Sequence, residues 1–534
     1  MTQVRTTLSL RGRIHSPTHP DATAMAVRDG VVVWLGGDDA GRGQFPDAEV
    51  VDLDGGFVAP GFVDSHIHLT ATGLSLTGLD LRASTSRAHC LQMIADYAAI
   101  HPGQPVWGHG WDESSWPERT APSTAELDAV LGARPAYLAR VDVHSALAST
   151  GLRERVPGLP SASEQRPLVG DAHHLVRAAA RNLLTDVQRG AARLAALDAA
   201  AANGIVAVHE CAGPEIGGLE DWRELRAVQH GVQLTGYWGE AVSSPAQARA
   251  VIEDTGAAGL AGDLFVDGAL GSRTAWLHEP YADASDGAGT CYVDPEVITA
   301  HVRACTEAGV TAGFHVIGDA AVSAVVAALE RVVDDLGVVA VAGCGHRLEH
   351  LEMVTADQAA KLGAWGVMAS MQPNFDARWG GREGMYARRL GVDRAAALNP
   401  FALLASQGVA LAFGSDAPVT GLDPWETVRA AANHHTPGSS VSVRAAFAAA
   451  TRGGWRAGGV GDGLTGTLVP GAPASYAVWD VGDLNELDAG TPSDAVRRWS
   501  TDPRSRVPAL PRLGAGDPLP RCRQTVHRGA VIHG

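Results

Sequence analysis

The chain has few cysteines, and their spacing does not indicate a structural framework. Six cysteines are scattered through 534 residues without a Cys-x-x-Cys pair. A disulfide network is not expected in a chain of this length, and a zinc–thiolate cluster needs closely spaced cysteines. Neither kind of site is therefore predicted.

Basic residues and long apolar segments are also scarce. The chain has 42 lysines and arginines against 59 aspartates and glutamates, a net charge of −17. That balance argues against nucleic acid or an anionic membrane as a partner, because phosphate recognition needs clustered cations. No apolar run approaches the roughly 18 residues of a membrane-spanning helix, and the N-terminus lacks the apolar core of a signal peptide. We expect a cytoplasmic protein with a small-molecule partner, and a homodimer is a candidate assembly.

The chain does have the length and composition of a multidomain globular protein. With 534 residues, 46% of them hydrophobic and 19% charged, it should hold two or more domains, one of them large. Both ends read as short alternating strands separated by Gly, Asp and Pro turns. We expect residues 1–58 and 464–534 to form one small composite β domain, and residues 59–463 to form the large domain.

The middle of the chain alternates apolar strands with Ala-rich helical stretches. Eight strands are expected, at residues 56–65, 204–208, 233–238, 263–267, 310–315, 346–350, 367–371 and 409–414. This alternation predicts an α/β fold, a (β/α)₈ TIM-like barrel. A barrel of eight strands is possible only if residues 70–200 are a large insertion after the first barrel strand. This insertion is expected to have helices at 87–99 and 172–198. Such an insertion would form a lid or wall over the barrel mouth.

A His-x-His pair ends the first of these strands. Residues two apart on a strand point the same way, so His66 and His68 present two imidazoles, common ligands of transition metals, to one point. His315 ends the fifth strand, His350 ends the sixth, and Asp416 follows the eighth. Active sites of such barrels lie at the C-terminal ends of the strands. We therefore expect these residues to meet there.

Four imidazoles and one carboxylate predict a metal site with nitrogen and oxygen ligands. Zinc suits it, with iron or manganese as alternatives, and Glu210 at the end of the second strand is a further candidate ligand. Bound Zn²⁺ lowers the pKa of water from about 15.7 to about 7, which makes hydroxide available at neutral pH. Asp416 is predicted to take the proton of that water and pass it to the leaving group. His350 or His144 is predicted to help the metal polarise a substrate carbonyl.

Motifs along nearly the whole chain resemble those of one family. They are Pro-Gly-Phe-Val-Asp-Ser-His-Ile-His at residues 60–68, Gly-Trp-Asp at 110–112, Asp-Gly-Ala-Leu-Gly-Ser-Arg-Thr-Ala at 267–275, His-Val-Ile-Gly-Asp at 315–319, Arg-Leu-Glu-His at 347–350, Gly-Ser-Asp-Ala-Pro at 414–418 and Gly-Thr-Leu-Val-Pro-Gly at 466–471. Together they resemble the amidohydrolase superfamily, in the group that contains N-substituted formamide deformylase and YtcJ. The resemblance implies a metal-dependent hydrolase with a composite β domain on a (β/α)₈ barrel.

One position departs from the family pattern. Many relatives carry a carbamylated lysine at the end of the fourth strand that bridges two metals, whereas this chain has Asp263 there. An aspartate cannot be carbamylated, so we expect one metal per chain. Whether Asp263 or Glu210 takes over the role of the lysine stays open.

The remaining group markers predict the substrate pocket. Trp111, Asp112 and His144 come from the insertion and are expected to face the metal, although Trp111 can equally anchor the insertion on the barrel.

Two further candidates for substrate binding follow the fourth strand. Arg273 lies after a Gly-rich turn, and its guanidinium suits a substrate carboxylate or carbonyl. It can equally form an ion pair with Asp283 or with Asp267, which is itself a candidate binding residue.

These features predict a metal-dependent amidohydrolase that hydrolyses a C–N bond of a small molecule, with an N-formyl or N-acyl amide favoured. Two alternatives stay open. One is a deaminase of a cyclic amidine that uses the same metal and Asp416. The other is a non-catalytic binding protein that retains the barrel.

Overall fold

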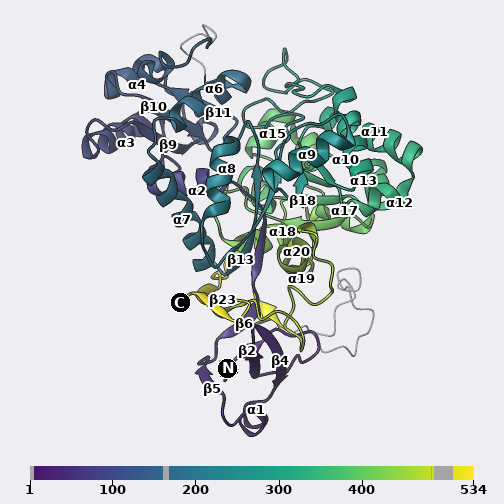
Figure 1. Ribbon diagram of the computed structural model, residues 1–534. Helices are drawn as coiled ribbons and strands as arrows, with labels where there is room; N and C mark the ends of the chain where they lie inside the picture. Colours follow the sequence, from purple (N-terminus) through teal and green to yellow (C-terminus); the bar gives the residue numbers. More distant parts are fainter. Residues whose placement is uncertain (1–4, 160–166, 483, 486–508) are drawn as a thin grey trace.

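Eight parallel strands close into a barrel at the centre of the molecule (Figure 1). The computed structural model describes residues 5–159, 167–482, 484–485 and 509–534. Ile67 pairs in parallel with Ala417, and the His68 N–H donates to the Ala417 carbonyl at 2.9 Å, which brings the two ends of the sheet together. The predicted (β/α)₈ barrel is thereby confirmed. Around the sheet, the strands are β7 (Phe62–Ile67), β13 (Ile205–Ala212), β14 (Gln233–Trp238), β15 (Gly259–Leu260), β16 (Thr311–Val316), β17 (Arg347–His350), β18 (Met368–Met371) and β19 (Ala410–Phe413).

Two of the expected strands differ from the structure. The first divides at Gly61 into β6 (Phe57–Pro60), which belongs to another sheet, and β7, which belongs to the barrel. The Gly61 N–H donates to Ser475 in the C-terminal segment, so the chain changes sheets there. The fourth strand is β15 rather than residues 263–267, because Gly262 turns the chain with a φ of 78°. Beyond that turn, Phe265 pairs with His315 through an isolated bridge.

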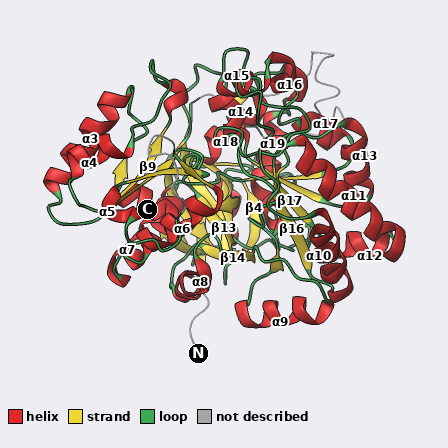
Figure 2. Cartoon of the chain, turned by 90° about the horizontal axis from the view of Figure 1, so that it is seen from above, coloured by secondary structure: helices red, strands yellow, loops and turns green. Residues whose placement is uncertain are grey.

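Helices surround the barrel, as Figure 2 shows from above. In α11 (Asp319–Leu336), Val322, Val325, Val326 and Leu329 are buried at spacings of three and four residues, so one stripe of the helix faces the core. The other helices around the barrel are α7 (Asp186–Ala202), α8 (Gly218–Ala227), α9 (Pro245–Thr255), α10 (Pro295–Ala308), α12 (Val338–Gly343), α13 (Ala356–Ala364), α14 (Pro373–Trp379), α15 (Met385–Leu390), α16 (Val392–Ala396), α17 (Phe401–Ser406), α18 (Pro424–Ala432), α19 (Val443–Ala448) and α20 (Gly454–Ala457).

The segment between β7 and β13 has a sheet of its own beside the barrel (Figure 1). The helix expected at residues 172–198 is two helices, because the Thr185 side chain caps the N-terminus of α7 in a capping box with Gln188. The sheet runs in the order β12 (Leu168–Val169), β11 (Ser145–Ala148), β10 (Ala136–Arg140), β9 (Val106–Trp111) and β8 (Leu79–Asp80). The helices are α2 (Leu69–Thr77), α3 (Arg87–Ile100), α4 (Thr124–Leu131), α5 (Thr150–Arg153) and α6 (Gly170–Arg181).

Both ends of the chain contribute to one sheet, as the composite arrangement predicts. Its order is β2 (Arg13–Ile14), β6, β20 (Tyr476–Asp480), β23 (Arg521–His527) and β24 (Ala530–His533). The Trp479 ring contacts Phe62 and Trp425 edge-on, with centroids 5.8 and 5.7 Å apart, and so joins this sheet to the barrel. A second sheet has the order β4 (Val31–Gly36), β3 (Ala24–Arg28), β1 (Thr6–Leu10) and β5 (Glu49–Asp52). Residues 486–508 of the expected composite domain lie outside the described residues.

No helix in the described part of the chain combines the length and the apolar character needed to cross a membrane.

The helix that follows the His-x-His pair packs backbone against backbone on α7. His68 is the N-cap of α2. At Gly73 in α2, a Cβ atom would lie 1.7 Å from the Ala192 carbonyl oxygen of α7. Only glycine fits this contact, and the contact fixes the direction in which the chain leaves His68.

We expect Gly73→Ala to lower the free energy of unfolding by about 1–3 kcal/mol, because the added methyl group forces the two helices apart. Gly190→Ala in α7 is the matched control, since a Cβ there meets nothing within 4 Å. It should raise stability by roughly 0.5–1 kcal/mol through helix propensity. Thermal denaturation checks both, and a Gly73→Ala protein as stable as the wild type would contradict the packing.

Candidate active site

Six buried polar residues meet at the C-terminal ends of the barrel strands. They come from β7, β16 and β17 and from the segments that follow β7, β15 and β19. Five of them are the residues that the strand pattern predicts to meet, and the sixth is at the position of the family lysine. They are His66, His68, Asp263, His315, His350 and Asp416.

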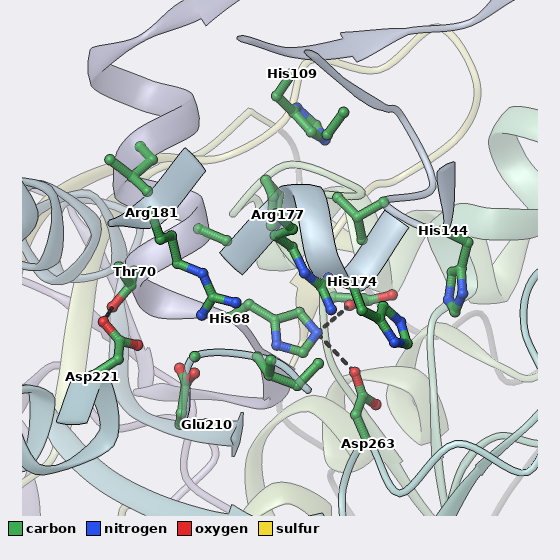
Figure 3. Close-up of a pocket in the computed structure, with 18 of the residues that line it drawn as sticks. His68, Thr70, His109, His144, His174, Arg177, Arg181, Glu210, Asp221 and Asp263 are labelled. Carbon is green, nitrogen blue, oxygen red and sulfur yellow. Dashed lines mark hydrogen bonds and ion pairs between the residues drawn. The ribbon is translucent and has the colours of Figure 1, made fainter. Parts of the chain in front are cut away.

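Two carboxylates lie between the imidazoles of the His-x-His pair. His66 Nε2 is 3.4 Å from Asp263 Oδ1 and 3.5 Å from Asp416 Oδ1. His68 Nε2 is 3.1 Å from Asp263 Oδ2, a contact drawn as a dashed line in Figure 3, and 3.3 Å from Asp416 Oδ1. Asp263 therefore contacts both histidines, where the family lysine would lie.

Neighbouring groups orient two of the imidazoles. His66 Nδ1 donates to Glu349 Oε2 at 2.8 Å, and His350 Nδ1 donates to Gln372 Oε1 at 2.7 Å. Each contact places the proton on Nδ1 and leaves Nε2 as the bare nitrogen. Such partners of the distal nitrogen are typical of metal-binding histidines.

Several buried polar atoms of this cluster have no hydrogen-bond partner among the described residues. They are His66 Nε2, His68 Nδ1, His350 Nε2, both ring nitrogens of His315, and Asp263 Oδ1. Leaving such groups unpaired is costly. Potential ligand atoms of His66, His68 and Asp263 all lie within 4.8 Å of one another, as do those of His66, His350 and Asp416. Nitrogen and carboxylate donors in this arrangement fit a divalent transition metal.

Charge and burial act differently on the imidazoles. Burial lowers the pKa of His68, but the carboxylates of Asp263 and Asp416 outweigh it and raise that pKa well above its usual value. Burial, reinforced by His315, lowers the pKa of His350 well below its usual value. His350 is therefore neutral at physiological pH, the form in which histidine binds metals.

A buried ion pair between Arg347 and Glu349 holds the carboxylate that contacts His66. Arg347 Nε donates to Glu349 Oε1 at 2.5 Å, and Arg347 also donates to the Ser65 carbonyl at 2.7 Å. Burial works to raise the pKa of Glu349, but Arg347 and His66 outweigh it and lower that pKa to about 2. The Arg347 guanidinium stacks 4.2 Å from the centroid of the Tyr237 ring. The motif at 347–350 contains both partners, but the sequence alone does not connect them to His66.

His144 and Glu210 lie at the edge of the cluster. The His144 ring centroid is 5.0 Å from that of His315, which places His144 beside the cluster. Glu210 accepts a hydrogen bond from the Leu69 N–H at 2.7 Å, and burial raises its pKa to about 7. It belongs to none of the groups of potential ligand atoms found among the described residues, so its role as a ligand stays a prediction.

The structure does not bring Trp111 and Asp112 to the metal cluster. Trp111 is fully buried in the core of the inserted segment, and its indole N–H donates to the Leu138 carbonyl at 2.8 Å. Asp112 pairs with Arg140 at 2.8 Å. Neither lines the cavities around the cluster. Both residues hold the insertion together because their polar groups have partners there.

Asp267 and Arg273 also have structural contacts. Asp267 accepts hydrogen bonds from the backbone N–H groups of Trp276, Ile317 and Gly318 at 2.7–3.0 Å. Arg273 makes a bidentate ion pair with Asp283 at 2.8 and 3.0 Å, the alternative that its sequence position left open. Neither side chain is free to bind a substrate.

Two cavities open on the cluster, and His144, His315, His350 and Asp416 line both. The α6 helix of the inserted segment contributes to the wall of the larger cavity. Figure 3 shows its lining. The smaller cavity is lined by aromatic residues of α14 and α15. Sequence reasoning missed the lining residues Arg177, Arg181, Phe375, Trp379 and Tyr386. No short sequence motif marks them, because the packing of each helix decides which of its faces lines the cavity.

A barrel with a histidine and aspartate cluster at its C-terminal end defines a class of metal-dependent hydrolases. The chain belongs to the amidohydrolase family, whose model matches residues 49–533.

Known relatives resemble the chain over most of its length. It is 26% identical to Protein LONG AFTER FAR-RED 3 of Arabidopsis thaliana, covering 88% of this chain and 85% of that protein. It is 27% identical to YtcJ of Bacillus subtilis, covering 76% of this chain and 79% of that protein. The solved structure of an uncharacterized metal-dependent hydrolase from Pyrococcus furiosus is 25% identical, with a TM-score of 0.67, and covers 89% of this chain and 98% of that one.

We expect Arg347→Met to lower the free energy of unfolding by about 3–5 kcal/mol, because it leaves Glu349 charged and unpaired in the core. Arg331→Met is the control. Its ion pair with Glu296 is exposed, so it should change stability by less than about 0.5 kcal/mol. Chemical denaturation measures both. Equal stability of the two variants would show that the buried pair does not support the site.

Proposed function

We propose that this amidohydrolase hydrolyses an amide C–N bond of a small molecule, N-formyl or N-acyl, with one divalent metal ion, best zinc. The observation that carries the proposal is the convergence of buried, unpartnered nitrogen and oxygen atoms at the barrel mouth. Neutral imidazoles and carboxylates are ligands that zinc prefers.

Four residues are the proposed ligands, because their donor atoms lie closest together: His66, His68, Asp263 and Asp416. His315 and His350 line the same space and complete the donor set. When bound, the metal supplies Lewis acidity, which polarises a carbonyl group and makes water more acidic.

One metal per chain fits the residues available. The only lysine of the sequence is Lys361. It lies on α13 with its ammonium group 2.5 Å from Glu330, so no lysine is present to bridge two metals as a carbamate. Asp263 contacts His66 and His68 in its place and is favoured over Glu210 for this role.

Asp416 is the proposed proton carrier. Its carboxylate contacts both His66 and His68 and lines both cavities, so it faces a substrate in either. It takes a proton from the attacking water and returns it to the leaving nitrogen. The backbone at Asp416 is left-handed, with a φ of 52°, which is unusual for a residue other than glycine.

His144 is better suited than His350 to donate a hydrogen bond to the substrate oxygen. The contact with Gln372 uses the one proton of neutral His350 and leaves a bare Nε2, which suits a metal ligand. His144 lines both cavities and has no such contact among the described residues. The cytoplasmic location and the homodimer stay predictions.

The wild-type protein should contain about one metal ion per chain, and His66→Ala/His68→Ala should contain none, because two neighbouring donors are lost. The double variant should also lose hydrolysis of N-formyl and N-acyl amides while keeping its secondary structure. His278→Ala, on an exposed side chain outside the cluster, is the control. Elemental analysis decides: metal retained by the double variant contradicts the ligand assignment, and two ions in the wild type contradict the single site.

Asp416→Asn should lower kcat by at least about 10²–10⁴-fold and keep most of the metal, because an amide oxygen can bind the ion but cannot take a proton. Asp357→Asn, at an exposed position in α13, should match the wild type. Steady-state kinetics on the best amide substrate, with metal analysis of the same samples, gives the result. Near-wild-type turnover in Asp416→Asn would mean that the proton takes another route.

A further inference from the structure

Two arginines of α6 point into the larger cavity. Arg177 and Arg181 are four residues apart, so they lie on one face of the helix. Figure 3 shows both guanidinium groups extending toward the side of the cavity that holds His68 and Glu210. The inserted segment thus places two positive charges beside the metal cluster.

Neither arginine forms an ion pair with a carboxylate in the described part of the chain. Arg177 donates to the backbone carbonyl of Glu215. The Nε atoms of Arg177 and Arg181 are buried and have no hydrogen-bond partner among the described residues. By contrast, the buried Arg140 and Arg347 each pair with carboxylates within 3 Å. A buried guanidinium without an anion is costly, and functional sites are where such groups are retained.

The carboxylates nearest the two arginines have other partners. Asp221 pairs with Arg193 at 2.6 Å, and Glu215 pairs with His174 at 3.2 Å. Glu210 accepts a hydrogen bond from the Leu69 backbone N–H at 2.7 Å. This part of the cavity therefore holds two guanidinium groups that make no ion pair with a carboxylate among the described residues.

Arg181 remains charged at neutral pH in the wall of the cavity. Burial, with Arg177 nearby, lowers the pKa of Arg181 to about 10, still well above neutrality. A guanidinium offers several N–H donors in a planar fork that matches a carboxylate or phosphate oxygen pair. Two of them on one helix face can hold one such group from two sides.

We propose that Arg177 and Arg181 form an anion subsite, so that the substrate of this amidohydrolase is an amide that also carries a carboxylate or phosphate group. The anion enters the larger cavity while the scissile amide lies at the histidine and aspartate cluster. Cleavage of such a substrate rests on the proposed function, whereas binding of the anion does not.

The test compares N-acetylphenylalanine with N-acetylphenethylamine, which lacks only the carboxylate. The wild type should show a kcat/KM about 10- to 100-fold higher for the carboxylate substrate, mostly through KM, because charge-assisted hydrogen bonds are lost with the neutral one. Arg181→Met should lower kcat/KM for the carboxylate substrate more than for the neutral one, and so remove this preference. Arg223→Met, on an exposed arginine paired with Asp254, should behave as the wild type.

A second measurement does not depend on catalysis. Acetate and inorganic phosphate, added separately to the metal-loaded protein, should raise the Tm of the wild type and of Arg223→Met more than that of Arg181→Met. The anion that gives the larger difference identifies the group. Arg181→Lys, which keeps the charge but not the fork, should recover part of the effect.

The outcomes separate the two proposals. If no amide is cleaved but the Tm difference is present, the anion subsite stands and the proposed function fails. If amides are cleaved with equal efficiency with and without a carboxylate, and Arg181→Met changes neither the kinetics nor the Tm shift, the subsite is overturned and the function stands. If Arg181→Met fails to fold or to bind metal, Arg181→Lys is the deciding variant. An Arg181→Lys protein with the same anion-induced Tm shift and the same carboxylate preference as the wild type would then show that the guanidinium fork does not bind the anion.

Discussion

The buried ion pair between Arg347 and Glu349 is the interaction on which the site depends. Glu349 receives the Nδ1–H of His66, and Arg347 keeps Glu349 ionised in the core. This chain of contacts fixes the ring of His66, which in turn lies within 3.5 Å of Asp263 and Asp416. Each buried charge is compensated by the next, so the whole cluster is held in one arrangement.

The barrel and the inserted segment contribute different parts of the site. The barrel strands bring the histidines and aspartates together because the C-terminal ends of parallel strands meet on one face. The inserted segment supplies Arg177, Arg181 and His144, which line the larger cavity but belong to no barrel strand. The proposed metal ligands and the proposed anion subsite therefore come from separate pieces of structure.

The two arginines of the larger cavity contrast with the net charge of the whole molecule. The chain has a net charge of −17, yet two arginines face the larger cavity without a carboxylate partner among the described residues. An acidic surface repels anions at long range, but salt screens it beyond about 10 Å, whereas charges inside a cavity act at contact distance. For the anion subsite proposed above, this contrast is consistent with a small anionic molecule rather than a polyanion, which would contact the whole surface.

The sequence by itself determined the barrel and the centre of the site. Apolar strands alternate with helices, and His66, His68, His315, His350 and Asp416 lie at strand ends, so parallel-strand geometry alone brings them together. The tertiary structure decided the rest, because it depends on contacts between distant segments. Trp111, Asp112 and Arg273 have hydrogen-bond or ion-pair partners near them in the fold and do not reach the cluster. Gly262 ends the fourth strand early. The left-handed backbone at His350, with a φ of 69°, lets both Glu349 and His350 face the site. Which face of α6 meets the cavity is set by the docking of the inserted sheet, and no local pattern records it.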